Sequence, residues 1–291
     1  MSDKKLDNVV QDIYDTVAIL GRGEPLEVSE EQLDQYAEFM KEALKDWLTP
    51  RANRKPTLRM SNVGKPSRQL WYDMNSDKEP VGIRPETMIK FLYGHILERV
   101  VLFLTELAGH EVTDEQKEVK VSGVLGHMDC KIDGEVVDIK SASGYAFQKF
   151  KNGTLAQDDP FGYMSQIAGY EHSEGTDQGG FLAINKENGE LALFRPEELD
   201  KPNIKAKIKK IKSQLKDETP PDRCYTPIPD GAAGNMKLPR MCTYCSHKFE
   251  CHADANDGKG LRVFEYSKGL NYLTKTVREP KVNEITHKII Q

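Results

Sequence analysis

Apolar positions recur at helical spacing in three stretches of the N-terminal part of the chain. Residues 4–20 and 30–48 each carry apolar side chains three or four positions apart, and Ser29 is placed to cap the second stretch. A third, longer stretch begins near Pro85 and ends at Gly109, a residue type that is common after helix C-termini. The pattern predicts three helices, with an irregular, polar and basic segment before the third.

Alternating apolar and polar positions then predict strands. The runs KEVKVSG, GHMDCKID and GEVVDIKSA each read as one strand, and two helical stretches and the hairpin pattern GGFLAINKENGELALFRP follow them. The lysine-rich segment 196–216 is expected to form another helix, whereas Pro, Gly and Cys become frequent beyond Pro221 and predict loops. The expected fold class is α/β, with a small mixed central sheet flanked by helices.

Length and composition add an expected domain organisation. The chain has 291 residues, of which 38% are hydrophobic and 30% charged, as in a globular protein with a sizeable core. We expect a helical N-terminal region at 1–84, a core at 85–200, and a C-terminal region with a basic helix and four cysteines at 201–291. No apolar run is long enough to span a bilayer, and the N-terminus does not resemble a secretory signal. The expected location is the cytoplasm.

The charge is unevenly distributed. The net charge of -5 argues against a protein that coats nucleic acid, but residues 48–72 contain no acid and several Arg and Lys. The stretch KPNIKAKIKKIKSQLK, from Lys201 to Lys216, contains seven lysines and no acid. Such runs either follow a phosphate backbone or form a solvated helix face, and both interpretations stay open.

An Asp-Gly pair at 133–134 predicts a tight hairpin turn, because both residue types tolerate positive φ. The turn places Asp129 opposite Asp138, and the alternation of a strand puts Lys140 and His127 on the same face. Like charges placed directly opposite destabilise a sheet, so a divalent cation is expected between the two aspartates. The alternative is a pair of solvated acids at the end of a sheet. Lys140 suits the polarisation of a water molecule or the balancing of charge on a phosphate.

These residues resemble a known signature. Asp129, followed on the next strand by Asp138-Ile139-Lys140, resembles the motif of the PD-(D/E)XK nucleases and specifically of their RecB-like branch. This motif alone is weak, but two further motifs stand in the right order within about residues 86–195.

Both further motifs lie on predicted helices. In FLYGHILE, Gly94 and Glu98 resemble the first motif of the branch, in which the acid lies on the face that the glycine leaves open. In SQIAGY, Gln166 and Tyr170 resemble the QxxxY motif, whose two members lie one helical turn apart. Without the resemblance, Glu98 would be an exposed acid and the other two would be ordinary residues of a helix surface.

The resemblance implies a restriction-endonuclease-like core that hydrolyses DNA. The groups expected to hold one or two Mg²⁺ (or Mn²⁺) ions are Glu98, Asp129, Asp138 and the carbonyl of Ile139. Lys140 would activate the attacking water, and Gln166 and Tyr170 would reach toward DNA or the active site. In-line displacement would leave a 5′ phosphate, and no base needs to be read. His127 stays an undecided neighbour of the site.

The resemblance implies a DNA exonuclease, and the compact size without a helicase P-loop motif suggests a free-standing enzyme. The resemblance implies a role in DNA recombination or repair or in phage DNA metabolism, in the host cytoplasm if the protein is encoded by a phage. Its partner would be DNA ends, single- or double-stranded, and a homo-oligomer or a single-strand-binding protein partner is compatible with it. The alternatives are a structure-specific or CRISPR-adaptation endonuclease, a DNA-end binding module, and an iron–sulfur redox sensor.

Four cysteines near the C-terminus have the spacing of ligands. Cys224, Cys242, Cys245 and Cys251 form C-x17-C-x2-C-x5-C, and a CxxC loop presents two thiolates to one ion or cluster. Their last three resemble the C-terminal cysteines of iron–sulfur nucleases of the AddB and CRISPR-associated kind. Those families take a fourth cysteine from before the core, where this chain has Pro66 and Ser67.

This departure means that Cys224 would complete the set. A structural [4Fe–4S] cluster is favoured, and Zn²⁺, with His247 or His252 as substitute ligand, is the alternative. Cys130 is expected to be a small core residue.

Overall fold

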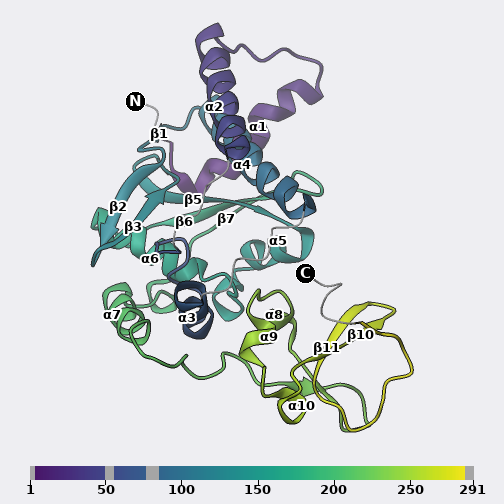
Figure 1. Cartoon of the computed structure of the whole chain (residues 1–291). Coiled ribbons are helices and arrows are strands. Elements are labelled where there is room, and N and C mark those ends of the chain that lie inside the picture. Colours follow the sequence, from purple (N-terminus) through teal and green to yellow (C-terminus); the bar gives the residue numbers. More distant parts are fainter. Residues whose placement is uncertain (1–3, 50–55, 77–84, 286–291) are drawn as a thin grey trace. The chain divides into compact units, whose positions relative to one another are not determined.

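The computed structural model describes most of the chain in two compact units (Figure 1). The described residues are 4–49, 56–76 and 85–285. The first unit comprises Met1–Gly64 and Arg84–Lys210, and the second comprises Lys65–Ile83 and Ile211–Gln291. Compactness alone does not test where independently folding domains begin, so the division into three regions stays a prediction.

The three helices predicted in the N-terminal part are present in the first unit. They are α1 (Val9–Gly21), preceded by a 3₁₀ turn at Leu6–Asn8, α2 (Glu30–Leu48) and α4 (Pro85–Leu107). Ser29 caps α2 as predicted: its Oγ accepts from the Gln32 N–H at 3.2 Å, and the Gln32 side chain accepts from the Ser29 N–H at 3.1 Å. Gly109 follows α4 with a φ of 84°, a conformation that glycine adopts without strain.

A mixed five-stranded sheet forms the centre of the first unit, as the predicted fold class requires. Its strand order is β1-β4-β5-β6-β7, in which β5 and β6 are parallel and all other neighbours antiparallel. The strands are β1 (Val112–Thr113), β4 (Cys130–Ile132), β5 (Glu135–Ala142), β6 (Gly180–Asn185) and β7 (Leu191–Phe194). A separate antiparallel hairpin consists of β2 (Lys117–Val121) and β3 (Val124–Met128).

The turn between β4 and β5 has the predicted geometry and register. Asp133 and Gly134 have φ values of 51° and 84°, and Ile132 pairs with Glu135 directly across the turn. The two pairs that follow are Lys131–Val136 and Cys130–Val137.

The ladder ends there, so the prediction of one continuous strand through GHMDCKID was wrong. Asp129 separates β3 from β4 and forms no strand pair with Asp138. Its Oδ2 instead accepts the Ile139 N–H at 2.8 Å, so a side chain replaces the expected backbone partner. The chain can therefore leave β5 at this residue, and β3 pairs with β2.

Three further helices follow β5 in the chain, and the first two of them contact the central sheet. They are α5 (Gly144–Lys151), α6 (Tyr163–Glu174) and α7 (Ile204–Gln214), with single 3₁₀ turns at Leu155–Gln157 and Glu198–Asp200. All three lie in segments for which helices were predicted. Ile204, Ile208 and Ile211 are buried along one side of α7, as the spacing of apolar residues on an amphipathic helix requires.

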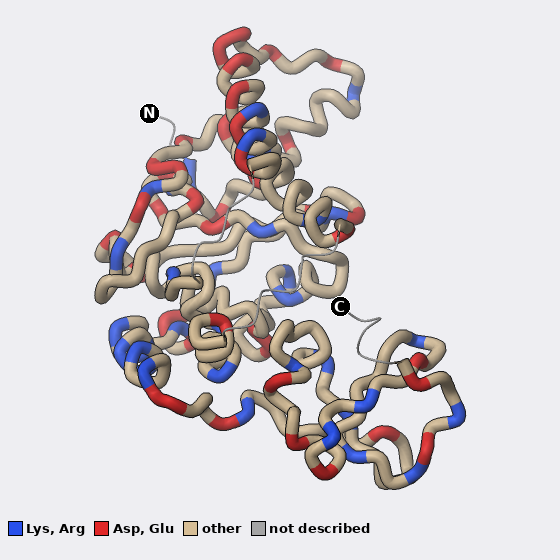
Figure 2. The backbone as a smooth tube through the Cα atoms, viewed as in Figure 1, with Lys and Arg blue, Asp and Glu red and all other residues tan. Residues whose placement is uncertain are grey.

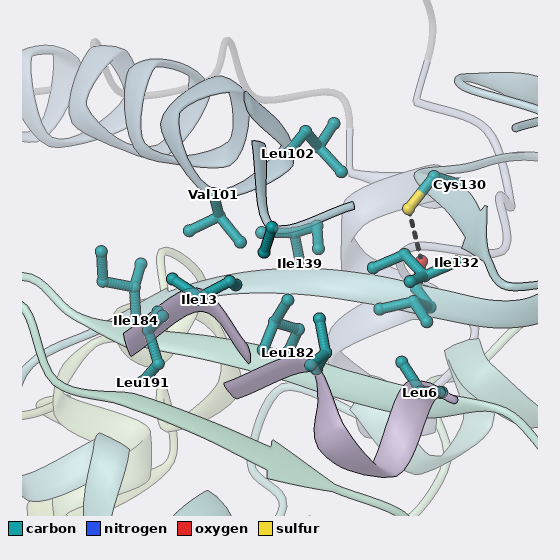
Figure 3. Close-up of a cluster of buried hydrophobic side chains, with 13 residues drawn as sticks. Leu6, Ile13, Val101, Leu102, Cys130, Ile132, Ile139, Leu182, Ile184 and Leu191 are labelled. Carbon is teal, nitrogen blue, oxygen red and sulfur yellow. Dashed lines mark hydrogen bonds between the residues drawn. The ribbon is translucent and has the colours of Figure 1, made fainter. Parts of the chain in front are cut away.

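Alternate side chains of β5 point to opposite faces of the sheet, one toward the apolar core and one toward the charged residues of the motif. Val137 and Ile139 pack into a buried cluster with Ile13 of α1 and with Val101 and Leu102 of α4 (Figure 3). Full burial of an aliphatic side chain stabilises a fold by about 1.5–3 kcal/mol. The intervening residues of β5 therefore project to the opposite face of the sheet.

The second unit contains α3 (Ser67–Asn75), three one-turn helices and an antiparallel sheet of order β12-β10-β11-β9-β8. The short helices are α8 (Arg240–Thr243), α9 (Lys248–Cys251) and α10 (Ala255–Gly258). The strands are β8 (Ile228–Pro229), β9 (Met236–Lys237), β10 (Arg262–Tyr266), β11 (Gly269–Lys275) and β12 (Glu284–Ile285). Only loops were predicted in this part of the chain, so the sheet is a correction. Its own small core includes Leu261, Val263 and Tyr272.

No helix among the described residues is both long and apolar enough to cross a bilayer.

Candidate active site

Three acids and one lysine of the predicted motif come together in the first unit. Asp138 and Lys140 lie on β5, Asp129 lies just before β4, and Glu98 belongs to α4. Asp138 is fully buried, and Lys140 forms an ion pair with its Oδ2. Neither Asp138 oxygen accepts a hydrogen bond of ordinary geometry. The site thus places a carboxylate where water cannot solvate it.

The environment raises the pKa of all three carboxyl groups. Burial is the largest cause for each, and the charge of Asp138 raises the pKa of both Asp129 and Glu98 further. For Lys140, burial alone would lower the pKa, but Asp138 and Asp129 outweigh burial and raise it above its ordinary value. Lys140 is therefore an ammonium at neutral pH in the metal-free protein.

Gln166 and Tyr170 connect Lys140 to the backbone of β3. Lys140 Nζ donates to Gln166 Oε1 at 3.4 Å, and Gln166 Nε2 donates to the Tyr170 hydroxyl at 3.0 Å. The hydroxyl in turn donates to the His127 carbonyl at 2.7 Å. Gln166 and Tyr170 are both buried, so they are not ordinary residues of a helix surface. The pair fixes the position of the lysine from the side of α6.

The His127 side chain does not share the site. It is exposed on β3, and its Nε2 lies 4.0 Å from Glu118 Oε2. Because the chain bends at Asp129, the strand alternation counted back from Lys140 does not extend to His127. The expectation of a shared face was wrong, and only the carbonyl of this residue takes part.

The glycine of the first motif lies where α4 passes β5. A Cβ at Gly94 would be 3.8 Å from Ser141 Oγ, with nothing nearer, and Glu98 follows one turn later. Gln116 Nε2 donates to Glu98 Oε1 at 3.0 Å and holds the carboxylate from outside the motif. The motif thus brings Glu98 to the same region as Asp138.

The acids can supply part, but not all, of a metal coordination sphere. Across the described ranges, no group of three or more His, Cys, Asp or Glu is placed to hold a metal ion. Mg²⁺, however, is commonly bound through one or two carboxylates, with water and substrate phosphate oxygens completing the octahedron. The mutual repulsion of these acids and the two Asp138 oxygens that lack ordinary hydrogen bonds fit such an ion.

The four predicted cysteine ligands line one pocket of the second unit. Cys224, Cys242, Cys245 and Cys251 share it with Pro66, a position at which the iron–sulfur nucleases were expected to have a cysteine. Its wall also includes Arg68, Tyr72, His247 and His252. The sequence spacing therefore identified residues that the fold brings together.

The thiols are close enough to influence one another. Burial raises the pKa of Cys242 to about 12, and Cys245, Cys251 and Cys224 add to the rise. Arg68 Nε donates to Cys251 Sγ at 3.1 Å. Thiols are the ligands that Zn²⁺ and iron–sulfur clusters prefer, and a bound ion would remove their protons. As the pocket stands, the described residues contain no group gathered tightly enough to hold an ion.

Two histidines and the fifth cysteine have roles of their own. His247 Nε2 lies 2.7 Å from Asp73 Oδ1, and burial lowers the pKa of His252 to about 4, so this histidine is neutral at pH 7. Cys130 is buried in the core of the first unit, as predicted.

The basic run at 48–72 is only partly visible as a surface feature. Arg51, Arg54 and Lys55 lie outside the described residues. Lys65 Nζ lies 3.4 Å from Asp73 Oδ2, and Arg68 is engaged in the thiol pocket. These two cations therefore serve the second unit internally.

No protein-family model matches the chain, and no curated protein does. Among solved structures, the alkaline exonuclease LHK-Exo from Laribacter hongkongensis is similar with a TM-score of 0.40 and 14% identity, over 59% of this chain and 92% of that one. The same exonuclease in complex with dAMP is similar with a TM-score of 0.33 and 13% identity, over 54% of this chain and 89% of that one.

The structure of SSO0001 gives a TM-score of 0.37 and 16% identity, over 72% of this chain and 93% of that one. The likeness in all three cases is distant, and it assigns neither a family nor a branch.

Sequence reasoning missed Tyr163 of α6, which lies against Lys140, and Lys207 of α7, which contacts α6. The Tyr163 ring lies 4.6 Å from Lys140 Nζ, and Lys207 Nζ donates to Ser165 Oγ at 2.6 Å. Lys207 was counted only as one member of a charged run. No short-range pattern marks these contacts, because each joins elements that are distant in the sequence.

Proposed function

We propose that the protein is a Mg²⁺-dependent deoxyribonuclease of the RecB-like PD-(D/E)XK kind, an exonuclease that acts at DNA ends and leaves 5′ phosphates. The observation that carries this proposal is the convergence of Glu98, Asp129 and Lys140 around the fully buried Asp138, whose charge raises the pKa of the other three groups. A purely structural ion pair between Asp138 and Lys140 would not need two further acids whose pKa the charge of Asp138 raises.

The metal would be held by Glu98, Asp129, Asp138 and the Ile139 carbonyl. When bound, it would supply Lewis acidity for the phosphate and for the attacking water. Lys140 contributes a positive charge that is positioned by Asp138 and Gln166, where it can stabilise charge developing on the phosphate.

Cations on α7 support nucleic acid as the substrate. Figure 2 shows Lys residues following one another along this helix, of which Lys205, Lys209 and Lys210 are exposed. Lys207 is half-buried against Ser165 and has no carboxylate within ion-pair distance among the described residues. Such cations bind phosphates without reading the sequence of bases.

The test is digestion of end-labelled linear DNA and of closed circular DNA with Mg²⁺. We expect the wild type to degrade the linear form and leave the circle intact, and Asp138→Asn to lose at least about a hundredfold in rate. Glu118→Gln is the matched control, because Glu118 is an exposed acid of β2. A wild type that opens the circle would indicate the endonuclease alternative, and one that binds ends without cleaving them would indicate an end-binding module.

We further propose that Cys224, Cys242, Cys245 and Cys251 hold a structural [4Fe–4S] cluster, with Zn²⁺ as the alternative. The support is their common pocket and the chemistry of four thiols. The group would stabilise the second unit and take no part in hydrolysis.

A further inference from the structure

A large aromatic side chain is exposed on the loop that leads into α6. Phe161 is 59% exposed. The loop that carries it is firmly anchored: Asp159 Oδ1 accepts from the Gly162 and Tyr163 N–H groups at 2.8 and 2.9 Å, and its Oδ2 accepts from the Met164 N–H at 2.8 Å. The three bonds satisfy donors at the start of the helix and fix the loop to it.

A second contact fixes the same loop from the other side. Gly162 has a φ of 79°, and its backbone packs so closely on Gly64 that a Cβ on either residue would overlap the other. The exposure of Phe161 is therefore a property of a well-supported loop, in which an apolar ring is held in solvent.

Phe161 begins a stack that ends at the active-site lysine. Its ring lies on that of Tyr163, with 5.5 Å between centroids and 27° between planes. Lys140 Nζ lies 4.6 Å from the Tyr163 ring centroid, in the range of a cation–π contact. Two aromatic rings thus connect solvent to the ammonium group.

We propose that Phe161, supported by Tyr163, is a stacking platform for an unpaired nucleobase of the strand whose phosphate lies at Lys140. This inference rests on the proposed function and narrows its substrate to single-stranded or frayed ends. A nucleotide matches the arrangement, because its planar base fits an exposed ring and an anionic phosphate fits Lys140 at the other end of the stack. Lys207, which contacts Ser165 of the same helix as Tyr163, adds a second cation on α7. A fully paired blunt end offers no free base face to the ring and is bound less well.

The experiment measures the dissociation constant of a labelled single strand in EDTA, where the strand is not degraded. The variants are Phe161→Ala, Phe161→Leu and Phe161→Trp, with Leu199→Ala as a control at a residue that is 96% exposed. A strand of equal length made of abasic nucleotides separates base contacts from phosphate contacts. Quenching of a 2-aminopurine base in the strand reports stacking directly.

We expect Phe161→Ala and Phe161→Leu to weaken binding of the normal strand about tenfold and to abolish the quenching, while Phe161→Trp retains both. Binding of the abasic strand should be the same for all variants. Equal weakening on the abasic strand, or a Leu variant that binds and quenches like the wild type, overturns the platform.

Cleavage with Mg²⁺, measured in parallel, separates the two levels of the proposal. If the wild type cleaves DNA and Phe161→Ala binds the single strand as tightly as the wild type does, the platform is wrong but the proposed function stands. A wild type that neither binds nor cleaves any strand removes the proposed function and the platform together. Binding of the abasic strand equal to that of the normal strand by the wild type shows that bases add nothing to the affinity and also overturns the platform.

Discussion

The residue that best shows the physical character of the site is Asp129. Its Oδ2 accepts the Ile139 N–H, which gives the carboxylate a structural role, while burial and Asp138 raise its pKa. The Asp129 side chain therefore ends a strand ladder and also adds a negative charge to a cluster in which burial and Asp138 disfavour that charge. Residues that serve binding commonly lower the stability of the unliganded fold in this way.

Asp129→Asn should stabilise the metal-free protein by about 1 kcal/mol at pH 8, because the amide still accepts from Ile139 without adding a buried charge. In the wild type, the raised pKa means that the folded state binds more protons than the unfolded state between the ordinary and the raised value. The advantage of the variant should therefore be greatest above the raised pKa and decline as the pH falls through it. Urea unfolding in EDTA at several pH values measures this. A variant that is less stable than the wild type at pH 8 would contradict it.

Tyr170→Phe tests the connection from Lys140 to β3. The substitution leaves Gln166 Nε2 and the His127 carbonyl without their partner, which should cost about 1–3 kcal/mol in the free energy of unfolding. We expect single-turnover cleavage to slow about tenfold with little change in DNA affinity, because Lys140 loses its fixed neighbour while remaining charged. Tyr93→Phe on α4 is the control, because Tyr93 is 51% exposed. An unchanged cleavage rate would show that the hydrogen bond from Gln166 to the Tyr170 hydroxyl is not needed to position Lys140.

At the scale of elements, close backbone contacts decide where α6 and its leading loop lie. A Cβ at Gly64 would meet only backbone atoms of Gly162, whereas one at Gly169 would meet the side chain of Met60. Gly64 and Gly169 are thus about equally crowded, the first by backbone atoms and the second by a side chain.

This difference makes a matched pair of substitutions. Gly64→Ala should destabilise the protein by about 1–3 kcal/mol, because two backbone segments must separate. Gly169→Ala should cost less, because the Met60 side chain can change rotamer and alanine is favoured inside a helix. Thermal unfolding of both variants measures the difference, and an equal loss in the two would contradict the backbone argument.

The elements that could be predicted are those whose signals are local. The Asp133–Gly134 turn and the Ser29 cap are each specified within a few residues, and both formed as predicted. The break at Asp129 could not be predicted, because it depends on a side chain that reaches the next strand. The strands β10 and β11 carried β-branched and aromatic residues, but the Pro, Gly and Cys around them concealed the pattern.

The same distinction applies to the site. Glu98, Asp138, Lys140 and the Gln166–Tyr170 pair could be predicted to lie together because motifs keep fixed spacings. Tyr163 and Lys207 were missed, since their contacts are set by the packing of α6 with β5 and α7.

At the scale of the whole molecule, the two compact units have different sources of stability. The first has a large apolar cluster built on its central sheet, whereas the core of the second is small. A small core commonly needs a covalent or metal cross-link, so the thiol pocket is where the second unit would gain stability.

If the pocket binds the proposed group, Cys242→Ser should abolish that binding and lower the unfolding temperature of the second unit while leaving that of the first unchanged. Protein purified without oxygen should show visible absorption and bound iron if the group is a cluster, or bound zinc without colour if it is not. Cys130→Ala is the control: it should reduce the stability of the first unit and leave the metal content unaffected. Equal metal content in the Cys242 variant and the wild type would exclude the proposed set of ligands.

Asp138 and Lys140 alternate along β5 with Val137 and Ile139. The two charged residues therefore face the site, and the two apolar residues face the core. Deleting one residue between the turn and Asp138 would turn the carboxylate and the ammonium into the apolar layer and bring Val137 and Ile139 to the face that carries the site. Removing two would return every side chain to its own side. The alternation of β5 therefore allows only insertions or deletions of an even number of residues between the Asp133–Gly134 turn and Asp138, so this segment can change its length in evolution only in steps of two.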